Sequence, residues 1–112
     1  MNRVRFPQTT IVVLLGTSFL ASPISLRADG DVDKLYQTNC VLCHAPDGSG
    51  SSPSGKALKA KDLRSEEVQK NSDEDLIEVI TKGKNKMPAF GKKLKAEQIK
   101  GLVAFIRALP KK

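Results

Sequence analysis

The sequence is poor in aromatic residues, cysteine and histidine. Aromatic residues make up 4% of the 112 residues, with no tryptophan, one tyrosine and four phenylalanines. Two cysteines form at most one bridge, which excludes a disulfide-rich scaffold. Together with the single histidine they give three ligands, too few for a tetrahedral Cys/His zinc site. The length excludes a large multidomain enzyme and allows one domain. We therefore expect something other than aromatic side chains to fill the core.

Residues 1–28 have the organisation of a secretory signal peptide. Arg3 and Arg5 form a basic start, residues 11–21 are apolar, and Ala28 is a small residue before an acidic segment. A membrane anchor is the alternative, but 11 apolar residues fall well short of the roughly 20 that span a bilayer. We expect cleavage after Ala28 and export to the periplasm, or to a lumenal compartment.

Cleavage after Ala28 would leave residues 29–112 as one domain of 84 residues. Its net charge would be +4, because three of the 19 Lys and Arg residues leave with the signal while all 12 Asp and Glu residues stay. A domain of this size buries a marginal core, and such domains often need a cofactor or a covalent staple.

The spacing of apolar residues predicts helices and no strands, and therefore an all-α domain. Helices are expected over residues 31–43, 65–70, 72–82 and 96–109, with irregular segments over 45–55 and 84–94. Ser72 is a typical N-cap and Gly83 a typical C-terminal stop for the third helix. The last helix lacks Ser, Thr or Asp at its start near Lys95, so we expect its first turn to fray.

Residues 40–44 read Cys-Val-Leu-Cys-His, the C-x-x-C-H motif that attaches c-type haem. Two cysteines three positions apart lie on one helical face, so both sulfurs can bond the two vinyl groups of one porphyrin edge as thioethers. The histidine that follows can then donate its imidazole to the iron as the proximal ligand. The motif predicts one haem c per chain, bound covalently through Cys40 and Cys43 and ligated by His44.

A cysteine pair at this spacing has two other known uses. A thioredoxin-type redox pair needs a βαβ context, and no strand precedes the motif. A local disulfide between Cys40 and Cys43 is compatible with export, but it leaves the adjacent His44 without a role. The two cysteines and the single histidine of the chain fall within five residues, and this favours haem.

Met87 is the candidate sixth ligand of the iron. The chain has no second histidine, and Met87 is the only methionine after residue 28. Pro88 biases Met87 toward an extended backbone, so the segment can cross the second haem face as a strap. A lone methionine is more often core filler, but lysines and a proline surround this one. Met/His ligation is the arrangement found in cytochromes c.

The chain resembles the small class I c-type cytochromes over essentially all of residues 29–112. The resemblance rests on CVLCH at 40–44, KMPAF at 86–90 and LVAFIRAL at 102–109. It implies an all-α class I cytochrome c fold, in which three to five short helices wrap around one covalently attached haem.

The resemblance also assigns roles to individual residues. Tyr36 and Phe105 match aromatic residues that lie near the crossing of the first and last helices. The carbonyl of Pro53 matches the acceptor of the Nδ1–H of the haem histidine, here His44. Val32 departs from the pattern, because many members have a small residue there, and we expect a helix crossing that is wider or differently angled.

The resemblance implies a periplasmic one-electron carrier of a respiratory or photosynthetic chain, and no enzyme. Ligands on both iron faces leave no open position for a substrate. An alternative is a haem protein with a labile sixth ligand, acting as a small-ligand sensor or as a subunit of a redox enzyme. A haem-free interaction domain with a disulfide is a third alternative.

Lysines are concentrated around Met87, whereas acidic residues gather at 62–78. The lysines are Lys82, Lys84, Lys86, Lys92, Lys93 and Lys95. They form either a solvated face or a positive rim that steers the protein to redox partners with acidic docking surfaces. Nucleic acid is not an expected partner, because aromatic residues are not interleaved with the lysines. We expect a monomer without stable membrane insertion after signal cleavage.

Overall fold

The computed structural model describes residue 16 and residues 28–111 of the chain. The signal peptide predicted for residues 1–28 lies almost entirely outside this part, so its cleavage stays a prediction. Within residues 28–111, no helix is both long enough and apolar enough to cross a membrane.

Six helices account for the regular structure of residues 28–111, which confirms the all-α prediction. They are α1 (Ala28–Asn39), α2 (Val41–His44), α3 (Pro53–Leu58), α4 (Glu66–Gln69), α5 (Asp73–Lys82) and α6 (Ala96–Ala108). The only β-type pairing in this part of the chain is an isolated bridge between Lys84 and Met87.

Residues 28–111 contain six helices, two more than the four ranges predicted from the sequence and one more than the upper limit of three to five. The two additional helices arise as follows. The helix expected over 31–43 is divided at Cys40, whose φ of −117° departs from helical geometry. The segment expected to be irregular ends in α3, where the Ser52 side chain accepts a hydrogen bond from the backbone N–H of Gly55 and Pro53 occupies the first turn. A serine cap followed by proline at the first helical position is a helix start that composition alone obscures.

The caps of α5 and α6 explain where these helices begin. In α5, Ser72 and Asp75 each bond the other's backbone N–H, and Gly83 follows the helix with a φ of +76°. In α6, the Gln98 side chain accepts a hydrogen bond from the Lys95 backbone N–H over 2.8 Å. Lys95 lacks a typical capping side chain, as expected, but Gln98 at the third position of the helix satisfies the Lys95 N–H.

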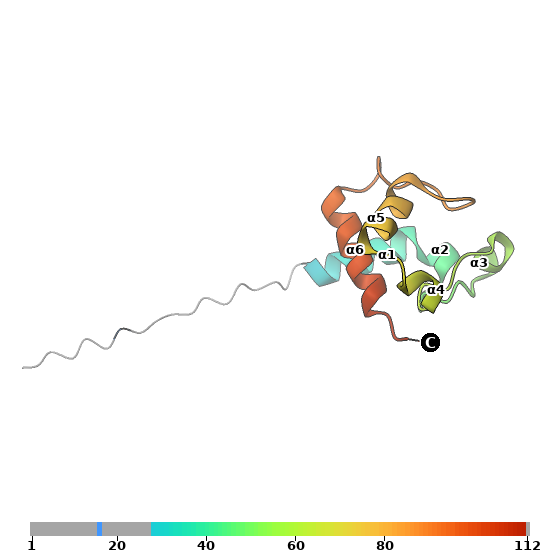
Figure 1. Cartoon of the computed structure of the whole chain (residues 1–112), viewed down its shortest axis with the longest axis horizontal. Helices are drawn as coiled ribbons and strands as arrows, with labels where there is room; N and C mark the ends of the chain where they lie inside the picture. The colour runs from blue at the N-terminus through green and yellow to red at the C-terminus, as the bar shows by residue number, and fades with distance from the viewer. Residues whose placement is uncertain (1–15, 17–27, 112) are drawn as a thin grey trace, which may run out of the picture.

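Helices α1 and α6 cross, and α5 packs beside α6 (Figure 1). The crossing is close despite Val32 on α1, because α6 presents Gly101 to that side chain. The small residue at this contact is on α6, opposite Val32, so the size of Val32 does not by itself require a wider crossing. Next to the crossing, the rings of Tyr36 and Phe105 stack with centroids 4.6 Å apart.

The buried hydrophobic residues form one cluster centred on α6. Among the described residues, the buried side chains are Tyr36, Ala45, Leu63, Val68, Leu76, Ile80, Leu94, Ile99, Leu102, Val103, Ile106 and Leu109. Tyr36 is the one aromatic residue among them. Several aliphatic side chains of this cluster also line a large cavity.

Candidate functional site

The segment Cys40–His44 is fixed by backbone bonds at both ends. The Cys40 carbonyl accepts the His44 N–H over 2.8 Å, and the His44 carbonyl accepts the Gly50 N–H over 2.8 Å. The Ser52 hydroxyl lies 2.7 Å from the Leu42 carbonyl, one of the groups that a four-residue helix cannot satisfy internally. The loop after the motif therefore holds the motif rigidly.

Ala45 adopts an unusual backbone conformation directly after the motif. Its φ is +65° and its ψ is 162°, a region that is costly for residues with a side chain. Its carbonyl accepts the hydroxyl proton of buried Tyr36 over 2.8 Å. Burial, followed by the nearby Cys40, raises the pKa of Tyr36, so the phenol stays protonated and keeps this bond.

His44 Nδ1 lies 3.0 Å from the backbone carbonyl of Lys61. A carbonyl only accepts, so this bond puts the proton on Nδ1 and leaves the Nε2 lone pair free for a metal. Burial lowers the pKa of His44, which favours the neutral, metal-binding form. The partner of His44 Nδ1 is thus the Lys61 carbonyl in place of the expected Pro53 carbonyl, and Pro53 is the first residue of α3.

Gly50 sets the position of the peptide that carries this acceptor. A β-carbon on Gly50 would lie 2.7 Å from the Ala60 carbonyl oxygen and 3.3 Å from that of Lys61. Its φ of +72° also favours glycine. Sequence reasoning missed the roles of Gly50 and Lys61, because a backbone acceptor 17 residues away leaves no side-chain signal. The only hint in the sequence was the glycine at position 50.

Cys40 and Cys43 are both half-buried and unbridged. Burial, followed by the proximity of Cys43, raises the pKa of Cys40 to about 11. A catalytic thiol of the thioredoxin kind needs a lowered pKa, because the thiolate is the nucleophile. The environment of Cys40 therefore counts against a redox pair, and residues 28–111 contain no strand that could supply the βαβ context.

Met87 belongs to a strap that closes on the end of α5. Lys84 and Met87 exchange two backbone hydrogen bonds of 3.1 and 2.9 Å around a tight turn. A β-carbon on Gly83 would lie 2.7 Å from the Met87 carbonyl oxygen, so the strap needs glycine there. The Phe90 N–H donates to the Ile80 carbonyl over 2.9 Å, which anchors the far end of the strap.

One cavity of about 490 Å³ brings the candidate residues together. Its lining includes Cys40, Cys43 and His44 from the motif and Met87 from the strap. Its aliphatic wall includes Leu63, Val68, Leu76, Ile80, Leu102 and Ile106. The volume lies in the range of roughly 300–1,000 Å³ of ligand pockets. An apolar cavity with two thiols, one imidazole and one thioether fits a c-type haem. The thiols can bond the vinyl groups, and the imidazole and the thioether can ligate the iron.

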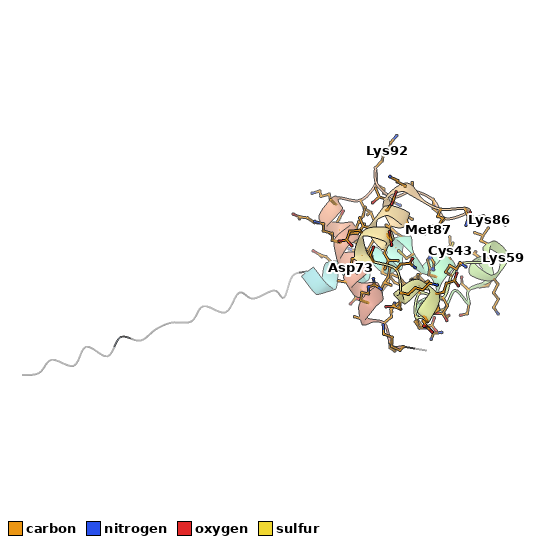
Figure 2. All side chains as sticks on the ribbon, viewed as in Figure 1. Cys43, Lys59, Asp73, Lys86, Met87 and Lys92 are labelled. Atoms are coloured by element: carbon orange, nitrogen blue, oxygen red, sulfur yellow. The ribbon has the colours of Figure 1, made fainter. Side chains whose placement is uncertain are left out.

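The mouth of the cavity combines exposed apolar and basic side chains. Leu42 and Leu58 are 74% and 41% exposed, and both line the cavity. The basic residues in the lining are Lys59, Lys61, Lys70, Lys84 and Lys86. Figure 2 shows Lys59 and Lys86 at the same end of the molecule as Cys43, with Lys92 at a separate edge.

The lysines predicted as a rim are therefore divided. Of the six that surround Met87 in the sequence, Lys84 and Lys86 line the cavity, whereas Lys92, Lys93 and Lys95 do not. Lys82 forms an ion pair with Glu78 at 2.9 Å. The cavity instead acquires lysines from the segment before α4, which the sequence alone did not single out.

Comparison with known proteins gives concordant matches. Residues 28–106 match the family described as cytochrome C oxidase, cbb3-type, subunit III. Cytochrome c6 of a Nostoc species is 39% identical over 99 residues, which cover 85% of this chain and 86% of that protein. Cytochrome c6 of Microcystis aeruginosa is 34% identical over 82 residues, which cover 73% of this chain and 98% of that protein.

A solved structure agrees with these relatives. The KustC0563 c-type cytochrome is 39% identical and superposes with a TM-score of 0.65 over 71% of this chain and 96% of its own. The chain thus belongs to the family that matches residues 28–106, and it is a small monohaem class I c-type cytochrome, an electron carrier with one covalently bound haem c and not an enzyme.

Proposed function

We propose that Cys40 and Cys43 carry the haem as thioethers, with His44 Nε2 and Met87 Sδ as the axial ligands of the iron. The observation that carries this assignment is that one cavity is lined both by the motif and by the only methionine after residue 28. Bound haem supplies the one-electron Fe(III)/Fe(II) chemistry.

The residues of the site favour electron transfer with little rearrangement. The Met87 thioether stabilises Fe(II) relative to a second imidazole and so favours a high potential. The Lys61 carbonyl orients the His44 ring and strengthens it as a donor. The strap and the motif are both held by backbone bonds, so the two ligands keep their positions when the charge of the iron changes.

The exposed part of the cavity mouth is the proposed docking surface for redox partners. We define it by Leu42, Leu58, Lys59 and Lys86. An apolar centre with lysines beside it complements a partner whose docking surface is apolar in the middle and acidic around it. The protein would act as a monomer in the periplasm or a lumen, after cleavage at Ala28, between partners of a photosynthetic or respiratory chain.

Ligation by Met87 can be tested by proton NMR of the reduced protein. A thioether methyl bound to haem iron lies over the porphyrin ring and is shifted far upfield by its ring current. The chain has no other methionine after residue 28, so the assignment of such a signal is unambiguous. A Met87 methyl signal at an ordinary position would contradict the assignment.

The docking surface can be tested with an acidic redox partner. We expect Lys59→Gln and Lys86→Gln to lower the bimolecular rate several-fold at low ionic strength, and the difference to vanish when salt screens the charges. Lys92→Gln is the matched control, because Lys92 does not line the cavity. Equal effects of all three substitutions would assign the rate to net charge and contradict this docking surface.

A further inference from the structure

Arg107, near the end of α6, joins three segments through one side chain. Its Nη1 donates to the carbonyl of Gln69, the last residue of α4, over 2.8 Å, and its Nη2 donates to the Asn71 carbonyl. Its Nε lies 3.0 Å from Oδ1 of Asp73, in the first turn of α5. The guanidinium group is planar and presents its donors as a fixed fork, so one arginine can hold several acceptors in one arrangement.

The Gln69 side chain extends this network to two more backbone carbonyls. Its Nε2 donates to the Leu63 carbonyl over 2.7 Å and to the Ile106 carbonyl over 3.2 Å. Its Oε1 accepts a hydrogen bond from Lys111 Nζ over 2.9 Å. The segment before α4 is thereby bonded to the end of α6, which lies beside α4 (Figure 1). We call Arg107 and Gln69 the clasp.

The clasp holds residues 66–72, which are α4 and the turn before α5 and which we call the α4 corner. A helix of four residues has too few internal bonds to be stable alone. Val68 is the one buried side chain of α4, and among residues 28–111 no other helix packs broadly against it. Arg107 bonds the carbonyl of the last residue of α4, a group that the helix cannot satisfy internally. The position of the α4 corner thus depends on polar bonds to α6.

The α4 corner forms part of the wall of the cavity that the haem would fill. Val68, Lys70 and Asn71 line this cavity. Leu63 and Ile106, whose carbonyls the clasp bonds, line it as well. Neither residue of the clasp is in the lining. The clasp therefore fixes the backbone that carries the lining side chains, without itself lining the space that they enclose.

We propose that Arg107 and Gln69 are positioning residues that hold the α4 corner against the haem and keep water from that part of the ring. The inference rests on the proposed function, in which haem occupies this cavity. Exclusion of water disfavours the more highly charged Fe(III) form and raises the midpoint potential. If the clasp is broken, the α4 corner should open locally, admit water and lower the potential. The Asp73 side chain is 62% exposed, so its ion pair adds little, and the bonds to carbonyls carry the clasp.

The test uses the covalent holoprotein and its variant Arg107→Lys, which keeps the positive charge but loses the planar fork. Amide hydrogen exchange and potentiometric titration are the two measurements. The amides of Lys70 and Asn71, which bond carbonyls of α4, should exchange about tenfold faster in the variant, because hydrogen bonds from a charged donor are lost. The amides of Leu102 and Val103, within α6, should keep their protection, and the midpoint potential should fall.

Two further variants separate the causes. Gln69→Leu removes the bonds to two carbonyls without a change in charge, so it should have the same two effects, and it provides the test if Arg107→Lys does not fold. Asp73→Asn weakens the exposed ion pair alone and is the matched control. Its potential and the exchange of its α4 corner should stay close to those of the wild type.

A general structural role of the clasp would give a different pattern. An unchanged potential in Arg107→Lys, with exchange that rises equally in the α4 corner and in α6, would overturn the proposal. Effects of Asp73→Asn as large as those of Arg107→Lys would also overturn it, because the ion pair would then hold the corner. A wild type without covalent haem would overturn the proposed function and this inference with it, whereas a covalent wild type with the same potential as Arg107→Lys would overturn the clasp alone.

Discussion

A β-carbon on Gly101 of α6 would lie 2.8 Å from Cγ2 of Val32 on α1. The two residues are complementary: a branched side chain on one helix occupies the space that glycine leaves on the other. Close packing of this kind couples the residues, because neither can change size without a response from the other. The contact lies beside the stacked rings of Tyr36 and Phe105 and keeps the two helices at the crossing close.

Gly101→Ala should destabilise the holoprotein by about 1 kcal/mol. Overpacking against Val32 costs roughly 1–3 kcal/mol, and the better helix propensity of alanine returns about 1 kcal/mol. In a Val32→Ala background the clash is gone, so the same substitution should become neutral or stabilising. Chemical denaturation of the four proteins of this cycle measures the coupling. Equal effects of Gly101→Ala in both backgrounds would show that the two residues do not constrain each other.

Gly50→Ala should raise the midpoint potential of the haem. The new β-carbon would push against the Ala60 and Lys61 carbonyls and weaken the bond from His44 Nδ1 to Lys61. A weaker bond makes the imidazole a poorer donor, and this destabilises Fe(III) more than Fe(II). Potentiometric titration of the purified protein measures the effect.

Gly48→Ala is the control for that variant. Gly48 has a similar φ of +79°, and its β-carbon would meet Leu109 Cδ1 at 2.6 Å rather than the Lys61 peptide. Both variants should lose stability, because alanine is strained at a positive φ. The potential should rise for Gly50→Ala alone. Equal shifts in the two variants would trace the potential to general loosening of the fold.

Ala45→Gly should stabilise the protein by less than about 1 kcal/mol. Relief of roughly 1–3 kcal/mol of strain at a sparsely populated backbone position outweighs roughly 0.5–1 kcal/mol for the greater freedom of glycine in the unfolded chain and about 0.8 kcal/mol for the loss of the buried Ala45 methyl group. Thermal unfolding of the holoprotein is the measurement. Ala60→Gly is the comparison, since Ala60 has no positive φ, and it should destabilise. A loss of stability on Ala45→Gly would mean that the strain at Ala45 is smaller than the combined cost of the lost methyl burial and the added freedom of glycine.

The helices and the chemical groups of the site could be predicted because their signals are local. The capping residues of α5 lie within four positions of each other, and the motif places Cys40, Cys43 and His44 within five residues. Met87 could be proposed because no other methionine follows residue 28. These predictions need only side-chain chemistry and spacing.

The rest depends on contacts between distant parts of the chain. The acceptor of the His44 proton is a backbone carbonyl of Lys61, and any residue type can supply such a group. Resemblance suggested Pro53, which the structure uses to begin α3. The partner of Val32 is the absence of a side chain at Gly101, and the lysines that line the cavity come from separate segments of the chain. None of these relationships has a sequence period or a motif.

Met87→Ala should lower the midpoint potential and open the iron to external ligands. Loss of the thioether removes the ligand that favours Fe(II) and leaves a coordination position for water or a small molecule. Carbon monoxide binding to the reduced protein should be absent in the wild type and rapid in the variant, as followed by visible spectroscopy. Lys86→Ala, next in the strap, should leave both properties unchanged. Rapid binding to the wild type would favour a haem protein with a labile sixth ligand.

The bond of haem to this chain through Cys40 and Cys43 can be tested by the mass of the chain under denaturing conditions, after expression in a host that attaches c-type haem. We predict that one haem stays with the wild-type chain and is lost from the Cys40→Ala/Cys43→Ala variant. A wild-type chain that carries no haem after denaturation would contradict it.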